Sequence, residues 1–112
     1  MTKDRDIVSE LEGGGFIMED LIDYQDGAIV SKTLIDKETG TLTVFAFDEG
    51  QSLSEHTAPH HAFLQVLDGE VKVTIEGEGY ELSRGETIAM PANKPHAVEA
   101  LSKFKMLLIM IR

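Results

Sequence analysis

Apolar and polar positions alternate along most of the chain in short segments that are typical of β-strands. The clearest segment is 70–76, in which Val71, Val73 and Ile75 alternate with polar residues, as in a sheet with one solvated face. Many short strands separated by turn signals predict a sandwich or barrel, because such strands must bury one face and protect their edges. The predicted strands are 28–35, 41–47, 52–56, 62–67, 70–76, 80–82, 87–90, 97–100 and 104–111.

Turn residues mark three of the connections between these strands. The dipeptide Asp68-Gly69 supplies the positive backbone angles that a tight hairpin needs. The segment Gly77 to Gly79 offers a second reversal, and Lys37 to Gly40 offers a third. We therefore expect hairpins at all three places.

The N-terminal end has a different pattern. Ile7, Val8 and Leu11 have helix-like spacing, and three consecutive glycines from Gly13 would end a helix there. We predict an N-terminal helix or arm over residues 1–27 and one β-domain over residues 28–112, with no repeat, linker or second domain.

Composition narrows the functional class. The 112 residues are 42% hydrophobic and 27% charged, as in an ordinary globular protein. Twenty acidic and ten basic residues give a formal net charge of -10, which disfavours nucleic acid and anionic membranes as partners. There is no cysteine, and the longest apolar run, Met106 to Ile111, is too short to span a bilayer. We expect a cytoplasmic protein.

The histidines carry the strongest functional signal. Three of the four lie between His56 and His61, and the fourth is His96. Histidine is the commonest metal ligand and titrates near neutrality, so converging histidines predict a metal site or an acid-base site. On a straight strand His56 and His60 would lie ~13 Å apart, too far for one metal ion. Pro59 makes a bend between them plausible.

Two stretches around these histidines resemble a known family. GQSLSEHTAPHHAFLQVLDG, Gly50 to Gly69, and GETIAMPANKPHAVEA, Gly85 to Ala100, look like the two motifs of the cupin superfamily. The resemblance covers roughly residues 28–111. It implies an all-β fold, a cupin-type double-stranded β-helix (jelly-roll) barrel, behind a short N-terminal helix or arm.

The resemblance also implies a metal site, for which this chain has two of the four ligands of the family. In the family, two histidines and a glutamate from the first motif and one histidine from the second bind a divalent metal. His56 and His96 match the first and last of these ligands, whereas Ala58 and Ala62 replace the second histidine and the glutamate. We take His56, His60 and His96 as the candidate metal ligands. The alternative is that His60 is an exposed loop residue and the barrel holds no metal.

Four further residues are candidates for a pocket around this site. His61 lies between the motif positions, and Gln65 interrupts an otherwise apolar strand. Met90 and Phe47 lie in predicted strands and are either pocket or core. For Gln65 the alternative is a place on the outer face of the barrel.

Three functions remain open. The first is a metal-dependent small-molecule enzyme, such as a dioxygenase or isomerase, holding iron, manganese, nickel or zinc. The second is a non-catalytic, metal-free barrel that binds or senses a small ligand, which the two alanines favour by enlarging the cavity. The third is assembly: 104–111 is apolar on both faces, so we expect a homodimer, with Phe16 to Ile22 as a possible crossing segment.

Overall fold

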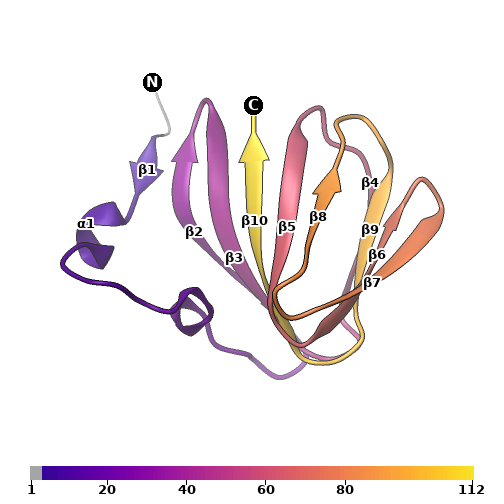
Figure 1. The fold of residues 1–112 in the computed structure, drawn as a ribbon, viewed down its shortest axis with the longest axis horizontal. Helices are drawn as coiled ribbons and strands as arrows, with labels where there is room; N and C mark the ends of the chain where they lie inside the picture. Colours follow the sequence, from indigo (N-terminus) through magenta and orange to yellow (C-terminus); the bar gives the residue numbers. More distant parts are fainter. Residues whose placement is uncertain (1–3) are drawn as a thin grey trace.

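Residues 4–112, the part of the chain that the computed structural model describes, form ten β-strands and two single-turn helices (Figure 1). This confirms the all-β fold class. The strands are β1 (Arg5–Asp6), β2 (Ile29–Lys37), β3 (Gly40–Phe47), β4 (Ser52–His56), β5 (His61–Asp68), β6 (Glu70–Ile75), β7 (Glu78–Ser83), β8 (Thr87–Met90), β9 (His96–Ala100) and β10 (Phe104–Ile111). The helices are α1 (Val8–Leu11) and the 3-10 helix η1 (Met18–Leu21).

The strands form two antiparallel sheets that face each other. The six-stranded sheet has the order β1-β2-β3-β10-β5-β8, and the four-stranded sheet has the order β4-β9-β6-β7. Figure 1 shows that the chain crosses between the two sheets at both ends of the strands, for example from β5 to β6 at the bottom and from β8 to β9 at the top. The last strand, β10, lies in the middle of the larger sheet, between β3 and β5. Such crossing connections close the sheets into a barrel.

All nine predicted strands are present, and their ends differ from the expected ones by a few residues at most. The short edge strand β1 was not predicted, because two residues are too few to show a period of two. The predicted N-terminal helix is only the four residues of α1. Within residues 4–112, no helix is long and apolar enough to cross a membrane.

Two of the three predicted hairpins are confirmed, and the third is wrong. β2 pairs with β3 around Lys37 to Gly40, and β6 pairs with β7 around Gly77. Asp68-Gly69 instead connects β5 of one sheet to β6 of the other. Gly69 does have the positive φ that was expected, +77°. The turn residues therefore predict the local backbone conformation, but they do not predict whether the two flanking strands pair with each other.

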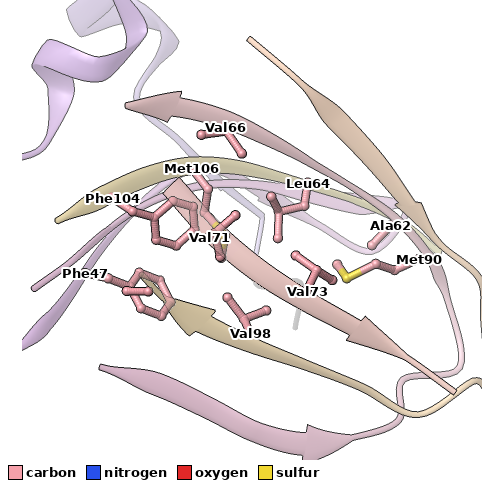
Figure 2. Close-up of a cluster of buried hydrophobic side chains, with 11 residues drawn as sticks. Phe47, Ala62, Leu64, Val66, Val71, Val73, Met90, Val98, Phe104 and Met106 are labelled. Carbon is pink, nitrogen blue, oxygen red and sulfur yellow. The ribbon is translucent and has the colours of Figure 1, made fainter. Parts of the chain in front are cut away.

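The space between the sheets is filled by one apolar cluster (Figure 2). Its largest members are the rings of Phe47 and Phe104, whose centroids lie 4.9 Å apart in a tilted arrangement. Tilted aromatic pairs add about 0.5–1.5 kcal/mol beyond the burial of their surface. The other members are Ala62, Leu64, Val66, Val71, Val73, Met90, Val98, Ala100 and Met106.

The N-terminal arm covers part of the outer face of the six-stranded sheet. Ile22 is only 5% exposed and packs there with Leu34, Val44 and Leu107 in a second apolar cluster. Met18, Leu21 and Ile22 pack on their own barrel, whereas Phe16 and Ile17 of the same segment are exposed, and the crossing of Phe16 to Ile22 to a partner stays a prediction. Both faces of β10 are apolar because it separates the inner cluster from this outer one.

Polar contacts hold the arm in place. The Tyr24 hydroxyl donates a hydrogen bond of 2.6 Å to the Asp68 carboxylate at the end of β5. Burial, followed by this hydrogen bond, raises the pKa of Tyr24 above its usual range. The ammonium of Lys105 donates to the Glu19 carbonyl at 2.8 Å and lies 4.9 Å from the centre of the Tyr24 ring. The arm is thus tied to β5 and β10.

Candidate functional site

The structure brings His56 and His96 together at one end of the barrel. The two residues are cross-strand partners, at the end of β4 and the start of β9. Their ring centroids lie 4.3 Å apart, and the rings meet edge to face at 69°. His96 shares the inward face of β9 with Val98 and Ala100 and is 8% exposed, whereas His56 is exposed. One ring therefore lies inside the barrel and the other lies at its mouth.

Hydrogen bonds to the backbone fix the proton on each ring. Nδ1 of His56 lies 2.8 Å from the Ser54 carbonyl oxygen, and Nδ1 of His96 lies 3.1 Å from the Lys94 carbonyl oxygen. A carbonyl oxygen only accepts, so both Nδ1 atoms must carry the hydrogen. The two Nε2 atoms are left with free lone pairs, and they face each other at 3.1 Å. Such a pair is stable only with a proton or a cation between the two nitrogens.

The loops that carry the two histidines are tied to each other. The backbone N–H of Asn93 donates to the carbonyl of Ala58 at 2.7 Å, and that of Ala92 donates to Nδ1 of His61 at 3.1 Å. Asn93 has a positive φ of 66°, a conformation that asparagine tolerates better than most residues. Because the loop before β9 is held against the loop after β4, the distance between the two imidazoles is set by the backbone.

His60 does not join this pair. It lies in the bend between β4 and β5, and among residues 4–112 no group of three His, Cys, Asp or Glu side chains is arranged to hold a metal ion. The bend at Pro59 occurs, but it does not bring a third ligand to the site. Of the three predicted ligands, the structure therefore assembles two.

The four predicted pocket residues divide between the two faces of the six-stranded sheet. Phe47 and Met90 belong to the inner cluster, at 0% and 4% exposure. His61 and Gln65 lie on the outer face of β5, because they alternate with Ala62 and the other inward residues of that strand. We correct the expectation for His61, which does not line the barrel interior; for Gln65 the structure shows the alternative given above, a place on the outer face.

Ala62 lies where the resemblance places a glutamate. It is 8% exposed, points into the inner cluster and is the cross-strand partner of Met90. A carboxylate at this position would enter the barrel, and the methyl group leaves that space apolar. The alanine therefore removes a negative charge from the interior without disturbing the strand.

A cleft that sequence reasoning missed lies between β7 and β8. It has a volume of about 410 Å³ and is lined by residues that include Ile75, Tyr80 and Lys94. Ile75 is the cross-strand partner of His96, and the Lys94 carbonyl accepts from the His96 ring. At the cleft, the Lys94 ammonium lies 3.2 Å from the Glu76 carboxylate. No pattern in the sequence shows that these two edge strands leave a gap.

The fold is a small antiparallel β-barrel, and its two paired histidines, His56 and His96, lie at one end. Residues 43–112 match the family model described as "Cupin domain". The chain therefore belongs to the cupin family, as the motif resemblance implied. No curated protein sequence matches the chain.

Solved structures give the same result. A conserved protein of unknown function from Streptococcus pyogenes is 31% identical, with a TM-score of 0.86 over 100% of this chain and 96% of that one. A cupin 2 conserved barrel domain protein from Leptotrichia buccalis is 43% identical, with a TM-score of 0.84 over 87% of this chain and 47% of that one. A cupin superfamily protein from Desulfitobacterium hafniense is 25% identical, with a TM-score of 0.86 over 89% and 92%.

Proposed function

We propose that the barrel binds a divalent transition metal ion through Nε2 of His56 and Nε2 of His96, together with a small anionic molecule. The observation that carries this proposal is the 3.1 Å separation of the two Nε2 atoms, in rings whose Nδ1 atoms lie next to backbone carbonyl oxygens. Two nitrogen ligands that each lie about 2.1 Å from one metal ion, at roughly a right angle, are about 3 Å apart. The pair thus fits two neighbouring positions of iron, manganese, nickel or zinc.

The coordination positions that the two histidines would leave open on the metal ion favour an anionic ligand. Both protein ligands are neutral imidazoles, and Ala58 and Ala62 contribute no carboxylate. A divalent ion held in this way keeps its full charge and most of its coordination sites. A small carboxylate with two oxygen donors would supply both the missing ligands and the missing negative charge.

The chain's own residues have separate roles in this site. The Ser54 and Lys94 carbonyls hold the rings with Nε2 toward the shared position. The apolar side chains around Met90 exclude water from the inner side. A divalent ion held by these two rings would act as a Lewis acid toward an oxygen of the small molecule, which is the chemistry of a metal-dependent isomerase.

A second candidate is a metal-free barrel, which the lack of a third ligand within residues 4–112 favours. In that case one proton lies between the two Nε2 atoms, and the pair is an imidazole-imidazolium cation. This pair would also bind a small anion, but without a metal ion and without Lewis-acid chemistry.

Elemental analysis and calorimetric titration with Ni²⁺ test the proposal. We expect one metal ion per chain in the wild type, loss of binding in His56→Ala and His96→Ala, and unchanged binding in the control His60→Ala. Binding that survives in both His56→Ala and His96→Ala contradicts the metal site. No Ni²⁺ binding to the wild type, with malonate binding that His96→Ala abolishes, identifies the metal-free alternative.

A further inference from the structure

An apolar cavity lies between the N-terminal arm and the outer face of the six-stranded sheet. It has a volume of about 240 Å³. Leu34 and Ile35 of β2 and Leu42 of β3 form its floor. Figure 1 shows α1 and the loop that follows it beside β2, and side chains from this part of the arm form the roof. The roof residues are Val8, Leu11, Glu12, Phe16 and Met18.

A β-bulge in β2 shapes the floor. The register with β3 shifts between Thr33 and Ile35, so Leu34 is an extra residue in β2. Consecutive side chains of a regular strand point to opposite faces, yet Leu34 and Ile35 both line this cavity. The Leu34 carbonyl also accepts a hydrogen bond of 3.0 Å from the N–H of Ile7, the N-cap of α1. The bulge therefore widens the apolar floor and anchors the arm over it.

The roof leaves apolar surface uncovered. Val8 and Phe16 are 49% and 48% exposed, although both line the cavity. They are joined through the loop with Gly13, Gly14 and Gly15, where a Cβ at any of the three positions would meet nothing within 4 Å. Half-exposed side chains above an apolar floor become more buried when a small apolar molecule fills the space between them, which favours binding of such a molecule.

The size and the charge of the cavity define the molecule that fits it. Its volume is about eight times the roughly 30 Å³ of one water molecule, so it holds an apolar body of about eight non-hydrogen atoms. Within residues 4–112, Glu12 is the one charged residue that lines it. The whole chain has a net charge of -10. A negative head group would therefore be repelled at this cavity, and a positive one would be attracted.

We propose that the cavity binds a small amphiphilic amine. Its apolar body, about the size of a phenylethyl group, lies over Leu34 and Leu42, and its ammonium group lies beside the Glu12 carboxylate. This site is independent of the histidine site. The two share no residue, and they select ligands of opposite charge.

Methyl-detected NMR titration of the full chain with 2-phenylethylamine tests the proposal. Phenylacetate and 2-phenylethanol are matched probes, because they keep a similar apolar body and carry a negative or a neutral head group. We expect the amine to shift the methyl signals of Leu34 and Leu42. It should bind about 5-fold more tightly than phenylacetate, the upper range of what an exposed charge pair supplies.

Two matched variants test the role of the carboxylate. Glu12→Gln should remove the preference for the amine over phenylacetate, whereas the control Glu10→Gln, on the exposed part of α1, should keep it. Phe16→Ala takes away part of the roof and should weaken binding of all three probes about 5-fold. Circular dichroism establishes that each variant is folded.

Four results overturn the proposal. If the amine shifts neither floor methyl, or shifts only signals near His96, the cavity is not its site. If the wild type binds the amine and phenylacetate equally, or if the preference survives in folded Glu12→Gln, then Glu12 does not select the ammonium group.

Discussion

The backbone N–H of Ala92 donates a hydrogen bond to Nδ1 of His61 at 3.1 Å, across the two loops that carry the site histidines. His61 was predicted as a pocket residue, yet its side chain lies on the outer face. Its contact is with the loop that precedes His96. The residue therefore supports the site from outside the barrel, as a positioning residue.

Replacing His61 should destabilise that loop. In His61→Ala the N–H of Ala92 loses its acceptor, which costs about 1 kcal/mol of unfolding free energy. His61→Asn is the control, because its side-chain oxygen can replace Nδ1 as the acceptor. Urea denaturation and amide hydrogen exchange at Ala92 measure the effect. Equal exchange rates in the alanine variant and the wild type would show that this hydrogen bond does not protect the loop.

Tyr24 gives a pH-dependent prediction. Burial and the Asp68 carboxylate raise the pKa of Tyr24 in the folded state, so its contribution to stability is complete below the unfolded value of about 10 and is lost as pH rises above it. Tyr24→Phe removes the hydrogen bond and should cost about 1 kcal/mol at pH 8. The difference between wild type and variant should shrink at pH 10.5. A difference in urea midpoint that stays constant between the two pH values contradicts this assignment.

Gly69 and Gly85 form a matched pair for testing backbone packing. Both have a positive φ, +77° and +91°, but a Cβ at Gly69 would lie 1.9 Å from the Lys103 carbonyl oxygen, whereas a Cβ at Gly85 meets nothing within 4 Å. Gly85→Ala should cost about 1–2 kcal/mol from the strained conformation alone. Gly69→Ala adds the steric conflict and should cost at least about 2 kcal/mol more. Similar unfolding free energies for the two variants would contradict the close approach of β10 to this turn.

The strands could be predicted from the sequence because each carries its own alternation or turn signal. The convergence of His56 and His96 came from the motif resemblance, since forty residues separate them. The inner and outer faces of β5 could not be predicted. Phe63 and Leu67 are apolar on the outer face, so the alternation that would have placed His61 and Gln65 outside is hidden.

The connection between the sheets could not be predicted for a related reason. Asp68-Gly69 specifies a turn conformation, and that conformation is found at Gly69. Which strand then pairs with β6 depends on contacts far along the chain, such as those of β9. The cleft between β7 and β8 could not be predicted either. It exists because these two edge strands do not pair with each other, and no local sequence pattern shows that they stay unpaired.

Nitrogen-15 NMR of the histidine rings tests the central claim most directly. Long-range proton-nitrogen correlations report which ring nitrogen carries hydrogen, and the four single His→Ala variants assign the signals. We expect His56 and His96 to have hydrogen on Nδ1, and both Nε2 signals to shift together when Zn²⁺ is added, while the His60 signals stay unchanged. Hydrogen that stays on Nε2 of either ring at neutral pH after Zn²⁺ is added, or a Zn²⁺ response at His60 and His61 instead, would contradict the account.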